Sequence, residues 1–221
     1  MKNKQPTDSQ GKWVVQTARA KGVSLEEFQA AQDDGSFGRY IESLKGRKVR
    51  GYVPISEARI AELTELATKV GARIHILRRV RIKRDCEWQE AVNTAGLNTP
   101  EHYNVRKVGS LYLPNGMGEV EKDLVMLNYP QGGSWDKALA WGQAAKLKKT
   151  VPREVFAVGG QFPTLYNNLG TDQMYTVATT ECLFEGSRQA CFVWWVVSGR
   201  EAGLLWVSYF GVALVWFVFS E

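Results

Sequence analysis

Side chains of the types that catalyse reactions or hold metal ions are few in this sequence. It contains two histidines, His75 and His102, and three cysteines, Cys86, Cys182 and Cys191. None of them stands in a CxxC, HExxH or similar spacing, so a zinc site is not expected. Two histidines also give little basis for a histidine-based catalytic triad.

The acidic side chains in the last part of the chain do not form a ligand cluster either. A calcium site needs several carboxylate and amide oxygens close together. The carboxylates among the last predicted strands are Glu181, Glu185 and Glu201, and no Asn or Asp follows them. The sequence therefore predicts a protein that is not an enzyme and that uses no metal and no cofactor.

Basic residues are concentrated in the first part of the chain. The 221 residues carry a formal net charge of +5, and residues 1–150 contain 25 of the 28 lysines and arginines. A cationic strip within this part could bind the phosphates of nucleic acid. Its members would be Arg78, Arg79, Arg81, Lys83 and Arg84 in the basic segment 47–84. The alternative is a solvated strand edge that its charges protect from edge-to-edge pairing, because aromatic residues for base stacking are missing between the cations.

The end of the chain has the opposite character. From Ala202 to Ser220 there are 19 residues without a charge. That length approaches the ~20 residues of a membrane-spanning helix, so a C-terminal apolar anchor of a membrane-associated protein is one interpretation. The segment is also rich in valine and aromatic residues, which favour strands, and it lacks a flanking positive cluster.

The first residues of the chain are polar and show no secretory signal. We therefore expect a cytoplasmic or virion-associated protein rather than a Sec-secreted one. Residues 1–11 are predicted to be a disordered start.

Residues 12–108 are predicted to form a small basic α/β unit. Ser24 and Glu27 match a capping box for a short helix. Ser56 is the expected N-cap of a helix over 57–70, whose apolar residues follow the three/four spacing. Residues 47–54 and 73–84 alternate in polarity and are predicted as strands. The order strand, helix, strand would give a parallel pair with a crossover helix.

Residues 109–221 are predicted to form a second domain, so that the whole chain is of the α+β class. Its elements would be a strand over 119–129, helices over 135–148 and 152–158, and four strands over 174–184, 188–197, 202–210 and 214–219. Ser134 and Thr150 are the expected helix N-caps. This order matches the C-type lectin fold, in which the first and last strands pair and the middle strands form a second sheet.

The turn between the first two of these four strands predicts a register. If Gly186 and Ser187 are the two-residue loop, cross-strand partners sum to 373 and Cys182 faces Cys191. A disulfide would then require suitable Cβ geometry. Two buried free thiols are the alternative, because nothing in the sequence indicates an oxidising compartment.

Strand parity in the tail gives two apolar faces. One face of residues 201–210 would contain Leu204, Trp206 and Phe210, and the other Leu205 and Tyr209. Either both faces are buried, or one of them is an exposed apolar patch. Exposed patches of this kind usually mark interaction sites.

The last part of the chain also resembles a known family. The residues that carry the resemblance are Val177-Ala-Thr-Thr-Glu-Cys182, Arg188-Gln-Ala-Cys191, Val193-Trp-Trp195, Arg200-Glu-Ala202, Leu204, Trp206-Val207, Phe210 and Trp216-Phe217. They are similar to the variable target proteins of diversity-generating retroelements, found in uncultivated bacteria and archaea or their viruses. These elements rewrite scattered codons near the 3′ end of a target gene that encodes a C-type lectin fold. The resemblance covers roughly residues 112–221 and leaves out the basic unit.

The resemblance implies a non-enzymatic ligand-binding protein with a hypervariable surface. Its scaffold would consist of Trp194, Trp195, Trp206, Phe210, Trp216 and Phe217. Its ligand-binding face would consist of Phe192, Val196, Val197, Ser198, Gly199, Gly203, Leu205, Ser208, Tyr209, Gly211, Val212, Ala213 and Leu214. Because this face is mostly apolar, it would suit an apolar or aromatic ligand surface or a protein partner.

Overall fold

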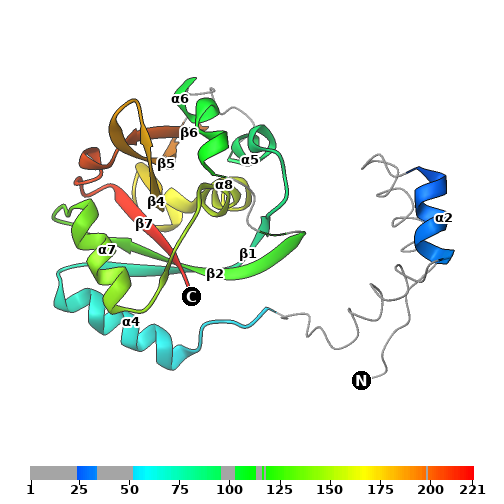
Figure 1. Cartoon of the computed structure of the whole chain (residues 1–221). Coiled ribbons are helices and arrows are strands. Elements are labelled where there is room, and N and C mark those ends of the chain that lie inside the picture. Colours follow the sequence, from blue (N-terminus) through cyan, green and yellow to red (C-terminus); the bar gives the residue numbers. More distant parts are fainter. Residues whose placement is uncertain (1–23, 34–51, 96–102, 113–115, 117, 198) are drawn as a thin grey trace. The chain divides into compact units, whose positions relative to one another are not determined.

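A computed structural model describes residues 24–33, 52–95, 103–112, 116, 118–197 and 199–221. The chain divides into two compact units, residues 1–51 and 52–221, and each is described by itself (Figure 1). In the first unit, helix α2 spans Leu25–Asp33. The predicted capping box is confirmed, because the Glu27 amide donates to Ser24 Oγ and the Ser24 amide donates to the Glu27 carboxylate. The predicted disordered start lies outside the described residues.

The second unit combines helices with one mixed sheet and is of the α+β class. Its helices are α4 (Glu57–Lys69), α5 (Trp88–Thr94), α6 (Tyr103–Lys107), η1 (Gly109–Leu111), α7 (Trp135–Ala144), α8 (Pro152–Gln161), α9 (Leu165–Asn168) and η2 (Val207–Tyr209). Its strands are β1 (Arg73–Lys83), β2 (Glu119–Asn128), β3 (Lys148–Lys149), β4 (Gln173–Phe184), β5 (Ser187–Val196), β6 (Gly199–Trp206) and β7 (Val215–Ser220).

The strands form a single sheet in the order β1-β2-β7-β4-β5-β6, with β3 pairing to β7. The predicted pairing of the first and last strands of residues 109–221 is confirmed, because β2 and β7 are antiparallel neighbours. The predicted separate sheet of middle strands is wrong. Strand β4 pairs in parallel with β7 and thereby joins β5 and β6 to the same sheet.

The first strand of this sheet comes from the basic segment. Strand β1 pairs with β2 in antiparallel orientation, and within the described ranges no strand pairs with β1 in parallel, as the predicted crossover unit would require. Residues 47–51 of the other expected strand lie outside the described part, and 52–54 are not in a strand. Because β1 and α4 complete the same sheet and core, the compact unit begins at Tyr52 and not at residue 109.

Helices cover both faces of the sheet (Figure 1). On one face, α5 and α8 pack over a cluster that contains Val80, Phe156 and Trp195. On the other, α4 and α7 pack over a cluster that contains Leu63 and Phe217. The clear periodicity of 57–70 follows from burying one side of α4 against this sheet.

A bulge in β1 changes which of its side chains face which cluster. The register shifts between Leu77 and Val80, where Arg79 adopts a left-handed conformation with φ of 59°. Ile74 and Ile76 therefore pack on the α4 side, while Leu77, Val80 and Ile82 face α5 and α8. An extra residue in one strand produces this change of face.

Two of the predicted helix caps are confirmed. Ser56 accepts a hydrogen bond from the Arg59 amide, and Ser134 accepts one from the Lys137 amide. Thr150 is not the cap of α8, because its hydroxyl donates to the carbonyl of Val218 in β7 at 2.6 Å. The N-cap position is Val151, whose amide donates to Glu154 at 2.8 Å.

The hairpin between β4 and β5 turns one residue earlier than predicted. The loop is Glu185-Gly186, both with positive φ, and Phe184 pairs with Ser187. Such a pair of left-handed residues is typical of a type I′ turn. The predicted pairing of Cys182 with Cys191 is therefore wrong, and Cys182 faces Gln189. Cys182 and Cys191 are buried free thiols.

Candidate functional site

The middle of the predicted ligand-binding face is buried. Phe192 is 4% exposed, and it packs on Gly203 of the neighbouring strand. A Cβ atom added at Gly203 would lie 2.3 Å from Phe192 Cζ, so no larger side chain fits there without a shift. These two positions support the core and cannot vary freely, which corrects their assignment to the face.

The remaining members of the predicted face lie at both ends of β6. Val196 ends β5, Val197 follows it and Gly199 begins β6, and Ser198 lies outside the described residues. The segment that leads into β7 lies at this same end of the sheet, because the amide of Tyr175, which pairs with Trp194, donates to the Leu214 carbonyl. This segment contains Gly211, Val212, Ala213 and Leu214. Leu205, Ser208 and Tyr209 lie at the other end of β6, about 20 Å from Gly199 along the strand, so the predicted face does not form one surface.

Most of the predicted scaffold is buried as expected. Trp195, Phe210, Trp216 and Phe217 are each at most 2% exposed. Trp194 is half-buried and stacks on the Tyr175 ring, with centroids 5.7 Å apart and planes within 5°.

Trp206 does not belong to the scaffold, because 46% of its surface is exposed. It is the last residue of β6, and the chain turns into the 3-10 helix η2 directly after it. The alternation of a strand no longer applies beyond that turn. The parity that grouped Trp206 with Leu204 therefore does not place it in the core.

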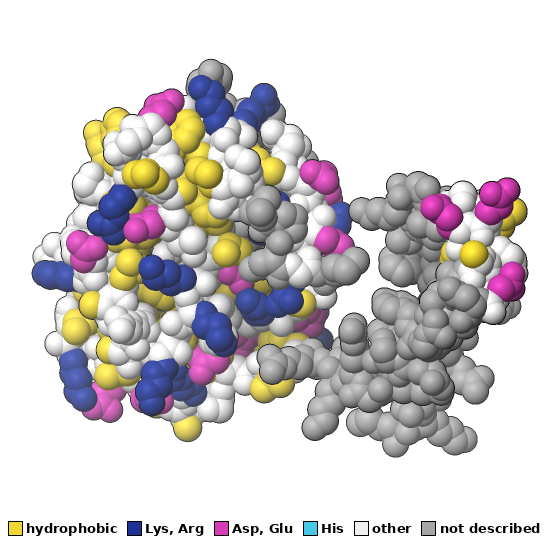
Figure 2. Space-filling view, viewed as in Figure 1, with side chains coloured by type: hydrophobic (Ala, Val, Ile, Leu, Met, Phe, Trp, Pro, Cys, Tyr) yellow, Lys and Arg dark blue, Asp and Glu magenta, His cyan; other side chains and the backbone are white. Residues whose placement is uncertain are grey.

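Trp206 and Tyr209 form an exposed aromatic pair at this end of the sheet. Their ring centroids lie 5.6 Å apart at 30°, and Tyr209 is 60% exposed. We call Trp206 and Tyr209 the aromatic end. Val212, which is 53% exposed, lies further along the chain, where its carbonyl accepts a hydrogen bond from the Val215 amide at the start of β7. Figure 2 shows hydrophobic side chains gathered at the upper left, where Figure 1 places β5, β6 and the segment after β6.

A pocket of about 280 Å³ adjoins the aromatic end. Strand β6 lines it with Leu204, Leu205 and Trp206, β5 with Ser187 and Gln189, and α6 with Asn104. Glu185 of the hairpin turn supplies a carboxylate. Four polar and three apolar residues line this pocket, so it offers hydrogen-bond donors and acceptors beside apolar contacts.

The sequence pattern identified only part of this site. The aromatic end stood out because the tail is uncharged and rich in aromatic residues. Asn104 of α6 lies far along the chain from Glu185 and Gln189 of the β4–β5 hairpin, and nothing in the local sequence distinguishes the three residues. Their convergence depends on the sheet order and on the hairpin register, which the sequence did not correctly predict.

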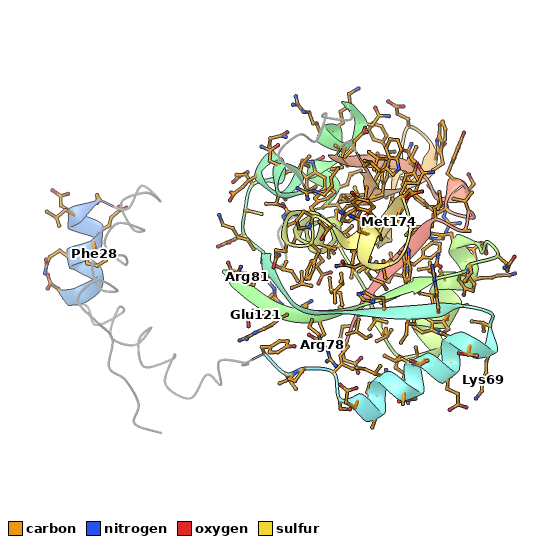
Figure 3. All side chains as sticks on the ribbon, turned by 180° about the vertical axis from the view of Figure 1, so that it is seen from behind. Phe28, Lys69, Arg78, Arg81, Glu121 and Met174 are labelled. Carbon is orange, nitrogen blue, oxygen red and sulfur yellow. The ribbon has the colours of Figure 1, made fainter. Side chains whose placement is uncertain are left out.

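The predicted cationic strip is largely neutralised by acidic neighbours. Arg78 pairs with Asp123 at 2.7 Å and with Glu57 at 3.0 Å. Arg79 pairs with Glu121 at 3.0 Å, and Lys83 pairs with Glu90. Figure 3 shows Arg78, Arg81 and Glu121 along the β1–β2 pair. These pairs reduce the positive charge that the strip can offer to a nucleic-acid backbone.

Asp123 explains why the bulge in β1 exists. Its buried carboxylate accepts hydrogen bonds from the Tyr52 hydroxyl, the Ile55 and Arg79 amides and the Arg78 guanidinium. Burial acts to raise the pKa of Asp123, but the hydrogen bonds from Tyr52, Arg79, Ile55 and Arg78 outweigh it and lower the pKa. The carboxylate is therefore a structural anchor that stays charged.

The buried thiols of Cys182 and Cys191 lack the lowered pKa that a reactive cysteine nucleophile has. Burial raises the pKa of both Cys182 and Cys191, so the protonated form is favoured. Across the described ranges, no group of three or more histidine, cysteine or acidic side chains is arranged to hold a metal ion.

The uncharged tail is not a membrane-spanning helix. Residues 202–220 form the end of β6, η2 and β7, and β7 lies between β2 and β4. No helix in the part of the chain that the structure describes is long and apolar enough to cross a bilayer. The lack of charge has another cause, because β7 is buried along its whole length.

Comparison with known proteins adds no relationship to these observations. No protein-family model, no curated protein and no solved structure matches the chain.

Proposed function

We propose that this protein is a non-enzymatic binding protein that holds a partner protein or another macromolecular ligand at its aromatic end. The scaffold in this proposal is C-type-lectin-like, and the binding surface is a variable one, diversified by a retroelement. The observation that carries the proposal is the exposed Trp206–Tyr209 pair beside a pocket of about 280 Å³.

The order of the elements supports a lectin-like scaffold. From β2 onward the chain follows strand, helix, helix and four longer strands, with the short strand β3 and helix α9 in between. Its first and last strands are paired. The single continuous sheet departs from the expected arrangement in two sheets.

The chemistry of the exposed residues supports a macromolecular ligand. Tryptophan and tyrosine are enriched among the residues that carry most of the energy of protein interfaces. Each offers a large apolar ring together with a polar group that can donate a hydrogen bond. The hydration of exposed apolar rings is unfavourable in the free protein. A partner that covers the rings removes their surface from water and thereby lowers the free energy.

The position of the aromatic end supports variability. Trp206 and Tyr209 lie at and after the end of β6, with about half or more of each side chain in solvent. Side chains that bury little surface contribute little to folding. They can change to suit different ligands while Trp195, Trp216 and Phe217 keep the core intact.

The proposal is tested by comparing two libraries of variants for folding and for binding. One library randomises Trp206, Ser208 and Tyr209. The matched library randomises the same number of buried positions in β5 and β7. We expect protease-resistant, folded clones to be common in the first library and rare in the second, and we expect only the first to yield binders of differing specificity. Equal loss of folded clones from both libraries would contradict the proposal.

The retroelement component has a separate test at the level of DNA. A near-copy of the 3′ coding sequence should lie close to the gene, differ from it mainly at adenines and accompany a reverse transcriptase gene. Substitutions between the two copies should fall on codons for the exposed residues after Leu205. If they fall equally on codons for β7, the surface is not the diversified one.

A further inference from the structure

A buried arginine without an acidic partner lies on the other side of the molecule from α7. Arg153, in the first turn of α8, is 6% exposed. Its guanidinium donates to the carbonyl oxygens of Tyr112 and Cys86 and lies 5.4 Å from the Trp88 ring. Its Nε is buried and has no hydrogen-bond partner. Among the described residues, no carboxylate forms an ion pair with it.

This arrangement leaves a full positive charge in the protein interior. Buried charges are normally paired, because removing an ion from water is costly. Hydrogen bonds to carbonyl oxygens and a contact with an aromatic ring compensate only part of the cost of burying the guanidinium charge. The neighbouring Glu154 does not fill the gap, because it pairs with Lys122. An external anion would supply the missing charge.

Arg153 lines a pocket that could admit such an anion. The pocket encloses about 170 Å³ between α8, α5 and the outer strand β1. Two further basic residues, Arg81 and Lys83, line it, and Glu119 is its acidic member. Lys83 forms an ion pair with Glu90, whereas Arg81 forms no ion pair with any described residue. The lining thus carries three cations against one carboxylate.

We propose that this pocket binds a small oxyanion, namely inorganic phosphate or the terminal phosphate of a small molecule. Guanidinium groups present several N–H donors in a planar fork that matches phosphate oxygens. The recessed shape favours a compact anion over a nucleic-acid strand, which needs a continuous cationic surface. The cations nearest to this pocket along β1, Arg78 and Arg79, are held by Asp123 and Glu121.

The experiment titrates the full chain with inorganic phosphate at constant ionic strength and measures binding by calorimetry. A phosphomonoester such as ribose 5-phosphate and a 20-mer single-stranded oligonucleotide are the comparison ligands. We expect saturable binding of one phosphate per chain. Tighter binding of the phosphomonoester would identify a small molecule as the source of the phosphate, and equal or weaker binding would identify the free ion.

Two variants locate the site. Arg81→Gln removes one exposed cation of the pocket, and we expect it to weaken phosphate binding about tenfold. Lys137→Gln is the matched control, because Lys137 is an exposed cation on α7, which packs on the other face of the sheet. Arg81→Lys keeps the charge and should retain most of the affinity. Because Arg153→Gln can disturb folding, Arg153→Lys tests the buried residue and should weaken binding while the protein remains folded.

Three outcomes would overturn the proposal. The first is a wild-type chain with no saturable phosphate binding at millimolar concentrations. The second is an equal loss of affinity in Arg81→Gln and Lys137→Gln, which would indicate non-specific attraction. The third is binding of the oligonucleotide without binding of phosphate, which would indicate a nucleic-acid surface in place of the small-anion site.

Discussion

Among single residues, Asp123 makes the strongest connection between distant parts of the fold. Its buried carboxylate joins the segment before α4, the bulge in β1 and strand β2. Asp123→Ala should lower the free energy of unfolding by about 3–5 kcal/mol, because it leaves the Ile55 and Arg79 amides without their acceptor and removes the buried partner of Arg78. Glu57→Ala is the control, since Glu57 pairs with the same arginine but is 89% exposed. Its effect should stay below about 1 kcal/mol. Both values are measured by urea denaturation, and similar losses would contradict the assignment.

The lowered pKa of Asp123 also predicts a dependence of stability on pH. The folded protein binds a proton at this carboxylate less readily than the unfolded chain, whose aspartates have a pKa of about 3.9. The stabilisation is therefore present above about pH 4 and is lost as the pH falls through the lower value of the folded state. Asp123→Asn should show a flatter decline in unfolding free energy below pH 4 than the wild type. Parallel pH profiles of the two proteins would show that Asp123 does not carry this dependence.

Two tryptophans of the tail should respond differently to truncation. Trp216 is 2% exposed within β7 and lies under the Arg73 guanidinium, so Trp216→Ala should destabilise by about 3–5 kcal/mol. Trp206 is 46% exposed, so Trp206→Ala should cost at most about 1 kcal/mol. Equilibrium denaturation followed by circular dichroism compares the two variants. Equal costs would return Trp206 to the scaffold, where the sequence placed it.

At the scale of elements, the sequence predicted what local chemistry determines. The caps at Ser24, Ser56 and Ser134 follow from side chains that satisfy free amides at helix starts, and all three are observed. The strands after residue 173 follow from their β-branched and aromatic content. The predictions that were wrong concern features that contacts between distant residues determine. Thr150 has the type of a cap residue, yet a carbonyl of β7 binds its hydroxyl.

The β4–β5 hairpin shows how a single residue sets the register of an element. Glu185 has a φ of 50°, which is unfavourable for a glutamate. The sequence did not point to this conformation, so the loop was predicted one residue too late. Glu185→Asn should raise the free energy of unfolding by about 0.5–1 kcal/mol, because asparagine tolerates the left-handed region and Asn-Gly favours a type I′ turn. Glu185→Gln is the control for the lost charge and should leave stability unchanged. Denaturation curves that show the same change for both variants would exclude the conformational cause.

At the scale of the whole molecule, the charge-free tail had two opposite explanations that local sequence could not separate. A strand buried on both faces and a membrane segment both require apolar residues. The sheet order decides between them, because it places β7 between β2 and β4. The same order brings the pocket residues of α6, β5 and β6 together. The site was thus predictable only as an aromatic surface, and its polar members were not.

The boundary of the folding unit gives the last prediction. Strand β1 covers the edge of β2 with a nine-pair register, and α4 and α5 complete the two core clusters. A chain of residues 52–221 should therefore unfold cooperatively with a melting temperature close to that of the full chain. A chain of residues 109–221 should aggregate or lack a cooperative transition, because it exposes the β2 edge and loses Leu63 and Val80 from the cores. Scanning calorimetry and size-exclusion chromatography compare the three proteins. A stable monomer of residues 109–221 would show that the basic segment is an accessory to the fold and that the domain begins where the sequence predicted it.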